Sequence, residues 1–178
     1  MLRRLLFYSL KICNGAVFSI FELEDDTMNL SENYLVAFWG ITAIIGLLFV
    51  QWFVASRSKG SQKGAIPGKI DPSLGHESFV FRANRTFMNS LENIPAMFAT
   101  CFLAILIGAN AYWTAIFIWT FVVSRIIHMI LYYIIATEKN PSPRTYFFTL
   151  GLFANLALFS LCVKTLYVHS IAVHSIAP

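Results

Sequence analysis

Polar side chains recur at helical spacing within residues 79–107, an otherwise apolar part of the sequence. Arg85, Asn89 and Glu92 are three or four residues apart, and a helix that advances about 100° per residue places them on one face together with Arg82. At about 1.5 Å per residue, Arg85 and Glu92 lie about 10 Å apart along the axis, too far for a direct ion pair on one helix. A small zwitterion with carboxylate and ammonium groups could bridge that distance.

A second polar stripe lies further along the chain, where Arg125, His128 and Tyr132 also share one helical face. The arginines of the two stripes, together with Arg144, face Glu92 as their only carboxylate. Because an unpaired buried charge is strongly destabilising, such an excess of cations needs anions from elsewhere. The pattern therefore predicts a site for a ligand that carries carboxylates.

Structural explanations for the same residues stay open. Arg85, Glu92 and Arg125 could form interhelical ion pairs that hold helices together. His128 could be a hydrogen-bonded core histidine, and Tyr132 could belong to an aromatic belt at a membrane interface.

The composition indicates a membrane protein. The chain has 178 residues, of which 57% are hydrophobic and 12% charged, and its mean hydropathy is +0.66. A soluble domain usually has about 25% charged residues. The net charge of +4 comes from basic residues spread between apolar segments, which argues against a nucleic-acid partner and for basic loops beside a lipid bilayer.

Four apolar segments reach the length of about 20 residues that a helix needs to cross a bilayer. Only helices and closed barrels satisfy the backbone in lipid, and no alternating pattern supports a barrel. The sequence therefore predicts an all-α, four-helix integral membrane bundle over residues 34–168, with an N-terminal extension (1–33) and a C-terminal tail (169–178). The predicted spans are residues 35–55, 79–107, 111–136 and 145–168.

The loops differ in charge, which predicts an orientation. Loop 56–78 contains Arg57 and three lysines, loop 137–144 contains Lys139 and Arg144, and the link 108–110 has no charge. Basic loops stay on the cytoplasmic side of membranes. We therefore expect loops 56–78 and 137–144 to be cytoplasmic, with both polar stripes near that face and both termini on the other side.

The N-terminal 33 residues have three possible interpretations. Arg3 and Arg4 precede a short apolar run, as in a signal peptide, but Lys11 and Asn14 interrupt it and no clean cleavage site follows. The segment could also be an interfacial amphipathic helix, or an upstream extension with the working start at Met28. We assign it no function.

The cysteines do not indicate a metal site. Cys13, Cys101 and Cys162 show neither metal-ligand spacing nor a disulfide framework. The last two lie within apolar segments and are expected to be small buried hydrophobic residues.

The polar motifs resemble those of the MAPEG family, the membrane-associated proteins of eicosanoid and glutathione metabolism. Arg85-x-x-x-Asn89-x-x-Glu92-Asn93-x-Pro95 resembles the family's second-helix signature. The run from Arg125 through His128 to Tyr132 resembles Arg-x-x-His-x-x-x-Tyr of microsomal prostaglandin E synthase, and Arg144-Thr145 resembles an Arg-Ser at the start of the fourth helix. The match covers roughly residues 34–168. It implies a homotrimer of four-helix subunits that binds glutathione, as cosubstrate, between neighbouring subunits near the cytoplasmic face.

The resemblance also implies a role for each matching residue. Arg144 would be the catalytic residue that activates the glutathione thiol, Glu92 would bind its ammonium group, and Arg57 would reach a carboxylate. A thiol has a pKa near 8.5, which falls beside cations, and an arginine stays protonated in such a site. The thiolate would attack a lipophilic electrophile or reduce a lipid hydroperoxide. The residues assigned to glutathione binding are Arg57, Arg85, Asn89, Glu92, Arg125, His128, Tyr132 and Thr145.

Some positions depart from the family pattern. Arg82-Ala-Asn-Arg85 also resembles the family's Arg-Ala-His-Arg, and in that register Asn89 would replace the glutamate. The register that retains Glu92 is preferred because Glu-Asn-Ile-Pro then fits as well. Met88 stands where prostaglandin E synthase has a second arginine, and Phe148 stands where a fourth-helix tyrosine is often found, which argues against prostaglandin isomerase activity.

Two other functions stay open. A non-catalytic member of the family, like the five-lipoxygenase-activating protein, would present lipid to a partner. A small carrier or channel subunit would contain buried charges along its path, but the polar residues here gather at one end of the spans.

Overall fold

The computed structural model describes residues 30–66, 68–139 and 141–176 of the chain. The chain divides into two units, Met1–Leu35 and Val36–Pro178. Of the first unit, only residues 30–35 are described; they contain a helical turn in which the N–H of Tyr34 donates to the carbonyl of Leu30 (3.2 Å). The three interpretations of the N-terminal extension therefore lie almost entirely outside the described residues.

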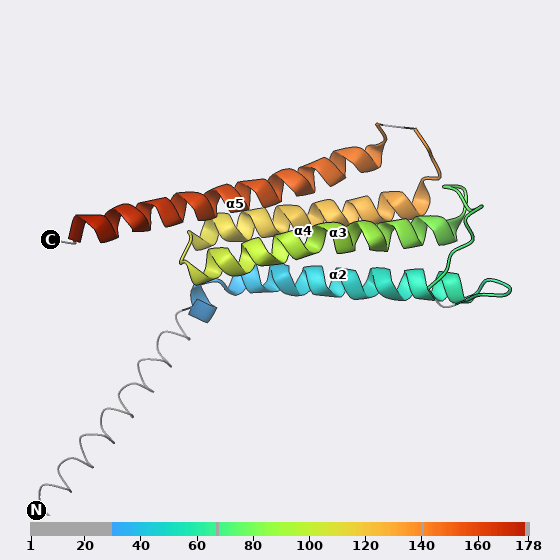
Figure 1. Cartoon of the computed structure of the whole chain (residues 1–178), viewed down its shortest axis with the longest axis horizontal. Coiled ribbons are helices and arrows are strands. Elements are labelled where there is room, and N and C mark those ends of the chain that lie inside the picture. The colour runs from blue at the N-terminus through green and yellow to red at the C-terminus, as the bar shows by residue number, and fades with distance from the viewer. Residues whose placement is uncertain (1–29, 67, 140, 177–178) are drawn as a thin grey trace, which may run out of the picture. The chain divides into compact units, whose positions relative to one another are not determined.

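Four long helices form the described part of the second unit (Figure 1). Each is long and apolar enough to cross a membrane, and the described residues contain no strand. Large apolar side chains such as Trp39, Phe53 and Phe153 point outward from the helices, as lipid-facing residues do. The predicted all-helical, four-span architecture is confirmed. The helices are α2 (Leu35–Gly60), α3 (Phe79–Leu106), α4 (Ala111–Ile134) and α5 (Pro143–Ile176).

Four of the predicted helix boundaries differ from the structure by two residues or more. Helix α2 continues to Gly60, and α4 ends at Ile134. Helix α5 starts at Pro143, because proline is favoured in the first turn, where its missing N–H costs no hydrogen bond. Arg144 therefore belongs to α5 and not to the preceding loop. No glycine or proline follows Gly151 before Pro178, so α5 continues through residues 169–176, which were expected to form a separate tail.

The core is formed where α4 packs against both α3 and α5. Phe121 of α4, Met97 of α3 and Leu158 of α5 are fully buried there. Helix α2 contacts α4 at Gly40, where a Cβ atom would lie only 2.5 Å from Cγ2 of Ile118. The missing side chain of Gly40 therefore permits this close approach.

The helix ends are fixed by local signals. Gly108 follows α3 with a φ of 67°, and the N–H of Ala109 donates to Ala104 (2.9 Å), as in a glycine-terminated helix. Asn110 then caps α4 through its side chain, which accepts from the N–H of Trp113 (3.1 Å). This tight link reverses the chain within a few residues and keeps α3 and α4 adjacent.

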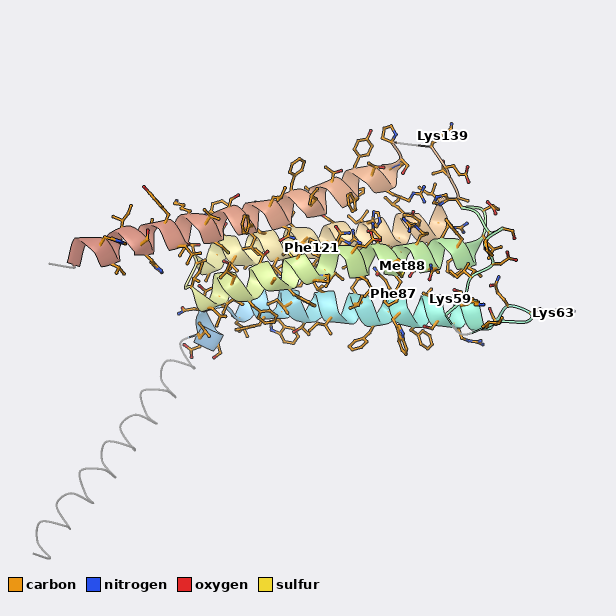
Figure 2. The ribbon with its side chains drawn as sticks, viewed as in Figure 1. Lys59, Lys63, Phe87, Met88, Phe121 and Lys139 are labelled. Atoms are coloured by element: carbon orange, nitrogen blue, oxygen red, sulfur yellow. The ribbon has the colours of Figure 1, made fainter. Side chains whose placement is uncertain are left out.

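The two basic loops lie at the same end of the helices. The α2–α3 and α4–α5 connections meet there, whereas the uncharged α3–α4 link lies at the other end (Figure 1). Lys59, Lys63 and Lys139 mark the basic end (Figure 2). The four apolar helices make this an integral membrane protein; that the basic end faces the cytoplasm stays a prediction.

Candidate functional site

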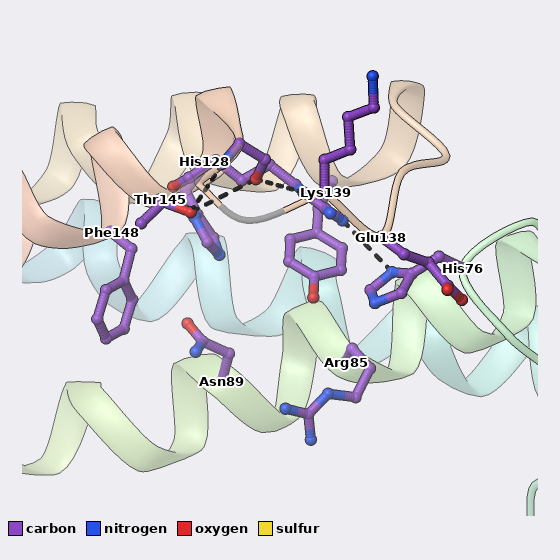
Figure 3. Close-up of a pocket in the computed structure, with 11 residues that line it drawn as sticks. His76, Arg85, Asn89, His128, Glu138, Lys139, Thr145 and Phe148 are labelled. Carbon is purple, nitrogen blue, oxygen red and sulfur yellow. Dashed lines mark hydrogen bonds between the residues drawn. The ribbon is translucent and has the colours of Figure 1, made fainter.

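A cavity of about 440 Å³ lies at the basic end, where α3, α4 and α5 begin or end (Figure 3). Its volume is within the range of small-molecule sites. Six of the sequence-predicted site residues line it, from three different helices: Arg85, Asn89, His128, Tyr132, Arg144 and Thr145. The remaining lining residues are His76, Glu138, Lys139, Ser142 and Phe148.

Arg144 is held firmly at the start of α5. Its Nη2 donates to the carbonyl of Thr137 (2.6 Å) and its Nε to the hydroxyl of Ser142 (3.4 Å). The guanidinium lies over the ring of Tyr132, with Cζ 4.2 Å from the centroid, a favourable cation–π contact. Nη1 also approaches Nδ1 of His76 (3.5 Å). Of five N–H donors, these contacts use three, so two stay available to a ligand.

Thr145 caps the same helix. Its Oγ1 accepts the N–H of Ser142 (3.2 Å), while its own N–H donates to the Ser142 carbonyl (2.9 Å). The side chain of Thr145 thus caps the N–H of Ser142, as the third helical residue does in one half of a capping box. The oxygen of Thr145 is the acceptor in this cap. Its Oγ1 also lies 3.5 Å from Oγ of Ser142, where either hydroxyl can donate; when Ser142 donates, the hydroxyl proton of Thr145 can donate to a ligand in the cavity.

His128 has a fixed tautomer. Its Nδ1 lies 3.0 Å from the carbonyl oxygen of Arg144; since a carbonyl only accepts, Nδ1 must bear the proton. Nε2 is then the acceptor of the neutral ring, and it is buried with no partner in the described residues. Its ring lies between those of Tyr132 and Phe148, with centroids 5.4 and 6.1 Å away. His128 therefore has an unused acceptor, at an atom that solvent does not reach.

Arg125 lies inside the bundle and not in the cavity lining. Its side chain is 2% exposed, and Nη2 donates to Oδ1 of Asn89 (2.6 Å) and Oγ of Ser90 (3.1 Å). The contact joins α4 to α3 and orients the Asn89 amide, which does line the cavity. Arg125 thus supports the site through Asn89.

Arg82 is also a structural residue. Its Nη1 donates to the carbonyls of His76 (2.6 Å) and Glu77 (2.8 Å), and Nη2 to the carbonyl of Tyr133 (3.4 Å). These bonds tie the end of the α2–α3 loop to the end of α4. They also fix the backbone of His76 beside the cavity.

His76 was missed by sequence reasoning. Its ring packs edge-on against Phe81 (5.0 Å) and lies 5.9 Å from the ring of Tyr132. Burial and the nearby Arg144 charge lower the pKa of His76, and the carboxylate of Glu138 opposes them. A lone histidine in a loop has no periodic pattern, so no signal in the sequence pointed to it. Glu138, Lys139 and Ser142 were missed for the same reason.

Besides Arg125, two predicted residues lie outside this cavity. Glu92 is exposed on α3, beyond the cavity lining. Arg57 is exposed on α2 and lines a separate hollow with Phe53 and Phe79. Tyr146, which could have replaced the missing fourth-helix tyrosine, points outward with 66% of its surface exposed, and Phe148 occupies the cavity wall instead.

The structure corrects the charge argument. Arg82 and Arg125 donate to neutral oxygens inside the protein, and neither lines the cavity. The Nε of each is buried with no partner in the described residues. The excess of positive charge lies around the cavity. Its lining contains Arg85, Lys139 and Arg144 but only one carboxylate, that of Glu138. Such a lining favours an anionic ligand.

Comparison with known proteins identifies the family. A search of curated proteins finds no match. A sequence model of the MAPEG family matches residues 36–164, which include every described residue that lines the cavity. The match agrees with the four-helix architecture and confirms the resemblance seen in the polar motifs: the chain belongs to the MAPEG family, membrane proteins of glutathione and eicosanoid metabolism.

Proposed function

We propose that the protein is a membrane-bound glutathione transferase that can also act as a glutathione peroxidase. One observation supports this most: six residues that resemble the family's glutathione site, drawn from α3, α4 and α5, line a single cavity with surplus positive charge. Glutathione has two carboxylates, one ammonium group and a thiol. The cavity offers complementary groups for an anion of this kind.

Arg85 and Lys139 are the candidates for the carboxylates. Arg85 is exposed and makes no hydrogen bond in the described part of the chain, and Lys139 projects from the α4–α5 loop. Charge-assisted hydrogen bonds of this type are about twice as strong as neutral ones. Asn89, already oriented by Arg125, supplies the cavity with its amide N–H groups.

Arg144 is the candidate for activating the thiol. It is buried, it is fixed by Thr137, Ser142 and Tyr132, and it retains two N–H donors. A cation at this position stabilises the thiolate over the thiol. The hydroxyl of Thr145 can donate to the same sulfur.

The thiolate would react with an apolar acceptor that enters from the bilayer. In conjugation, sulfur forms a bond to the electrophilic carbon and the leaving group departs with its electron pair. In hydroperoxide reduction, sulfur attacks the terminal oxygen, the O–O bond breaks, and the lipid leaves as an alcohol. A second glutathione then forms the disulfide and releases water.

Glu92 and Arg57 fit this proposal if the protein forms a homotrimer. Both side chains are exposed on the single chain, and neither lines the cavity. In a trimer with sites between neighbours, they would complete the site from an adjacent copy. Size determination in detergent with multi-angle scattering tests the assembly; a monomer would leave Glu92 without a role in binding.

The activity is tested by conjugation of glutathione to a chromogenic aryl halide. Arg144→Ala should lower kcat/KM at least about a hundredfold, the loss typical for removing one donor that stabilises a reacting anion. Arg144→Lys retains the charge and should retain part of the rate. Oligomeric size and helicity of both variants report whether the fold survives. Unchanged turnover in a folded Arg144→Ala variant would refute the assignment.

A non-catalytic, lipid-presenting role is the second candidate. Phe148 favours it, because it lines the cavity without the hydroxyl that a tyrosine would supply. Calorimetry separates the two: the enzyme binds glutathione, whereas the scaffold does not.

A further inference from the structure

A second cavity, of about 460 Å³, lies in the segment that joins α2 to α3. It shares no lining residue with the cavity around Arg144. Three lysines line it, Lys59, Lys63 and Lys69, together with the apolar side chains of Ile66 and Ile70. Lys59 lies at the end of α2 and Lys63 in the loop beyond it (Figure 2). These are three of the six lysines in the whole chain, so the clustering is pronounced.

The lysines lack an acidic partner. Asp71 is the one carboxylate in the lining, and its Oδ1 already accepts the N–H (2.9 Å) and the hydroxyl (2.7 Å) of Ser73. Lys59 reaches only a neutral group, Oδ1 of Asn84 at 3.4 Å. Within the described ranges, none of the three lysines forms an ion pair. The lining therefore contains three ammonium groups and one carboxylate, which already accepts hydrogen bonds from Ser73. A compact anion can balance the remaining positive charge.

The backbone gives this cavity a defined shape. Gly64 and Gly68 have φ values of 73° and 78°, in the left-handed region that glycine adopts without strain. The N–H of Ala65 donates to Gln62 (3.2 Å) and that of Lys69 to Ile66 (3.1 Å). These two turns fold the loop back on itself, so that Lys63 and Lys69 face the same hollow as Lys59.

The position of the cavity selects the kind of anion. Phe49, Trp52 and Phe53 are exposed on α2 one to three turns before Lys59, as residues in contact with acyl chains would be. The ammonium groups then lie at headgroup depth, and Ile66 and Ile70 add an apolar wall. We propose that this cavity binds the phosphate of an anionic phospholipid headgroup. Basic residues beside a membrane span each contribute about 1 kcal/mol to such binding.

The test is native mass spectrometry of the full-length protein in detergent. The protein is titrated with phosphatidylglycerol, with phosphatidylcholine of the same acyl chains, and with soluble glycerol phosphate. Phosphatidylglycerol should bind most tightly. Lys63→Gln, at an exposed side chain without a hydrogen bond in the described part of the chain, should weaken it about fivefold, and Lys63→Gln/Lys69→Gln should weaken it further by about the same factor.

Lys164→Gln is the matched control, since it removes one exposed lysine from α5 outside this cavity. It should leave the affinity unchanged, and Lys63→Arg should retain it. Equal binding of the two lipids, or equal losses in Lys63→Gln and Lys164→Gln, would overturn the proposal. If soluble glycerol phosphate binds as tightly as the lipid, the cavity is a site for free phosphate and the lipid assignment is wrong.

Discussion

Two arginine environments at the basic end of the bundle differ in whether a ligand in the cavity can reach the guanidinium. Arg125 lies between α3 and α4 and gives its hydrogen bonds to Asn89 and Ser90. Arg144 and Arg85 line the cavity, where Arg85 makes no hydrogen bond in the described residues. Arg125 also has unused donors, but its Nε is buried without a partner in the described residues and its side chain does not line the cavity. Both types looked alike in the sequence, as arginines at helical spacing. The difference teaches that an arginine in a membrane helix indicates a ligand only when its side chain lines a cavity that the ligand can enter.

Replacing Arg125 should give the largest effect, and the effect should be on stability. Arg125→Ala removes the donor to the oxygens of Asn89 and Ser90. Ser90 is buried, and an unpaired buried group costs about 1–3 kcal/mol. Unfolding in detergent, followed by circular dichroism against denaturant, should show this loss. If Arg125→Ala unfolded like the wild type, the distinction between the two environments would be wrong.

Replacing Arg85 should lower the affinity for glutathione and leave the stability of the fold nearly unchanged. Arg85→Ala should weaken glutathione binding by about tenfold to a hundredfold, the range for one hydrogen bond to a charged group, while the free energy of unfolding changes by less than about 0.5 kcal/mol. Isothermal titration calorimetry measures the affinity. An Arg85→Ala variant that binds normally but unfolds early would place Arg85 among the structural arginines.

Asn89 accepts a hydrogen bond from Arg125 and also lines the cavity, so replacing it tests both environments at once. Asn89→Asp gives Arg125 an ionised partner, so stability should be retained. It also adds a negative charge to the cavity wall, and about 1 kcal/mol of repulsion would lower the affinity for glutathione about fivefold. Unfolding measurements report the stability, and calorimetry reports the affinity for glutathione. A variant that loses stability but keeps its affinity would contradict this prediction.

The smallest expected effect is on pH dependence, through His76. The groups that face it are Arg82 and Arg85 from α3, Tyr132 from α4, Glu138 from the loop and Arg144 from α5. Because burial and the arginine charges lower its pKa below the ordinary 6.5, folded His76 stays neutral where the unfolded chain is protonated. Stability should therefore fall as the pH drops below about 6.5.

The pH effect is measured as the change in Tm between pH 7.5 and 5.5, with His76→Gln as the comparison. The variant should lose less Tm over this interval than the wild type. Equal losses would show that His76 does not couple folding to pH.

Most of the fold could be predicted from the sequence, because it depends on apolar length and helical periodicity, which recur along the chain. Apolar length predicted four helices, and helical periodicity placed Arg85 and Asn89 on one face and His128 and Tyr132 on another, which share a cavity in the structure. Helix α5 exceeded its predicted length because apolarity defines a membrane span and not the end of a helix.

The rest depended on contacts between segments far apart in the sequence. Ser90 satisfies Arg125 from another helix, and carbonyls of the α2–α3 loop satisfy Arg82. His76 reaches Arg144 across 68 positions. Neither periodicity nor charge counting reveals such partners, so the division of the arginines into structural and cavity-lining residues required the structure.

The most direct test of the central claim is an experimentally determined structure of the protein with glutathione bound. We predict glutathione in the cavity lined by Arg85, Asn89 and Arg144, with its sulfur within about 3–4 Å of the Arg144 guanidinium, the range of a charge-assisted contact to sulfur. Glutathione bound elsewhere, or bound in this cavity with its sulfur directed away from Arg144, would contradict the account.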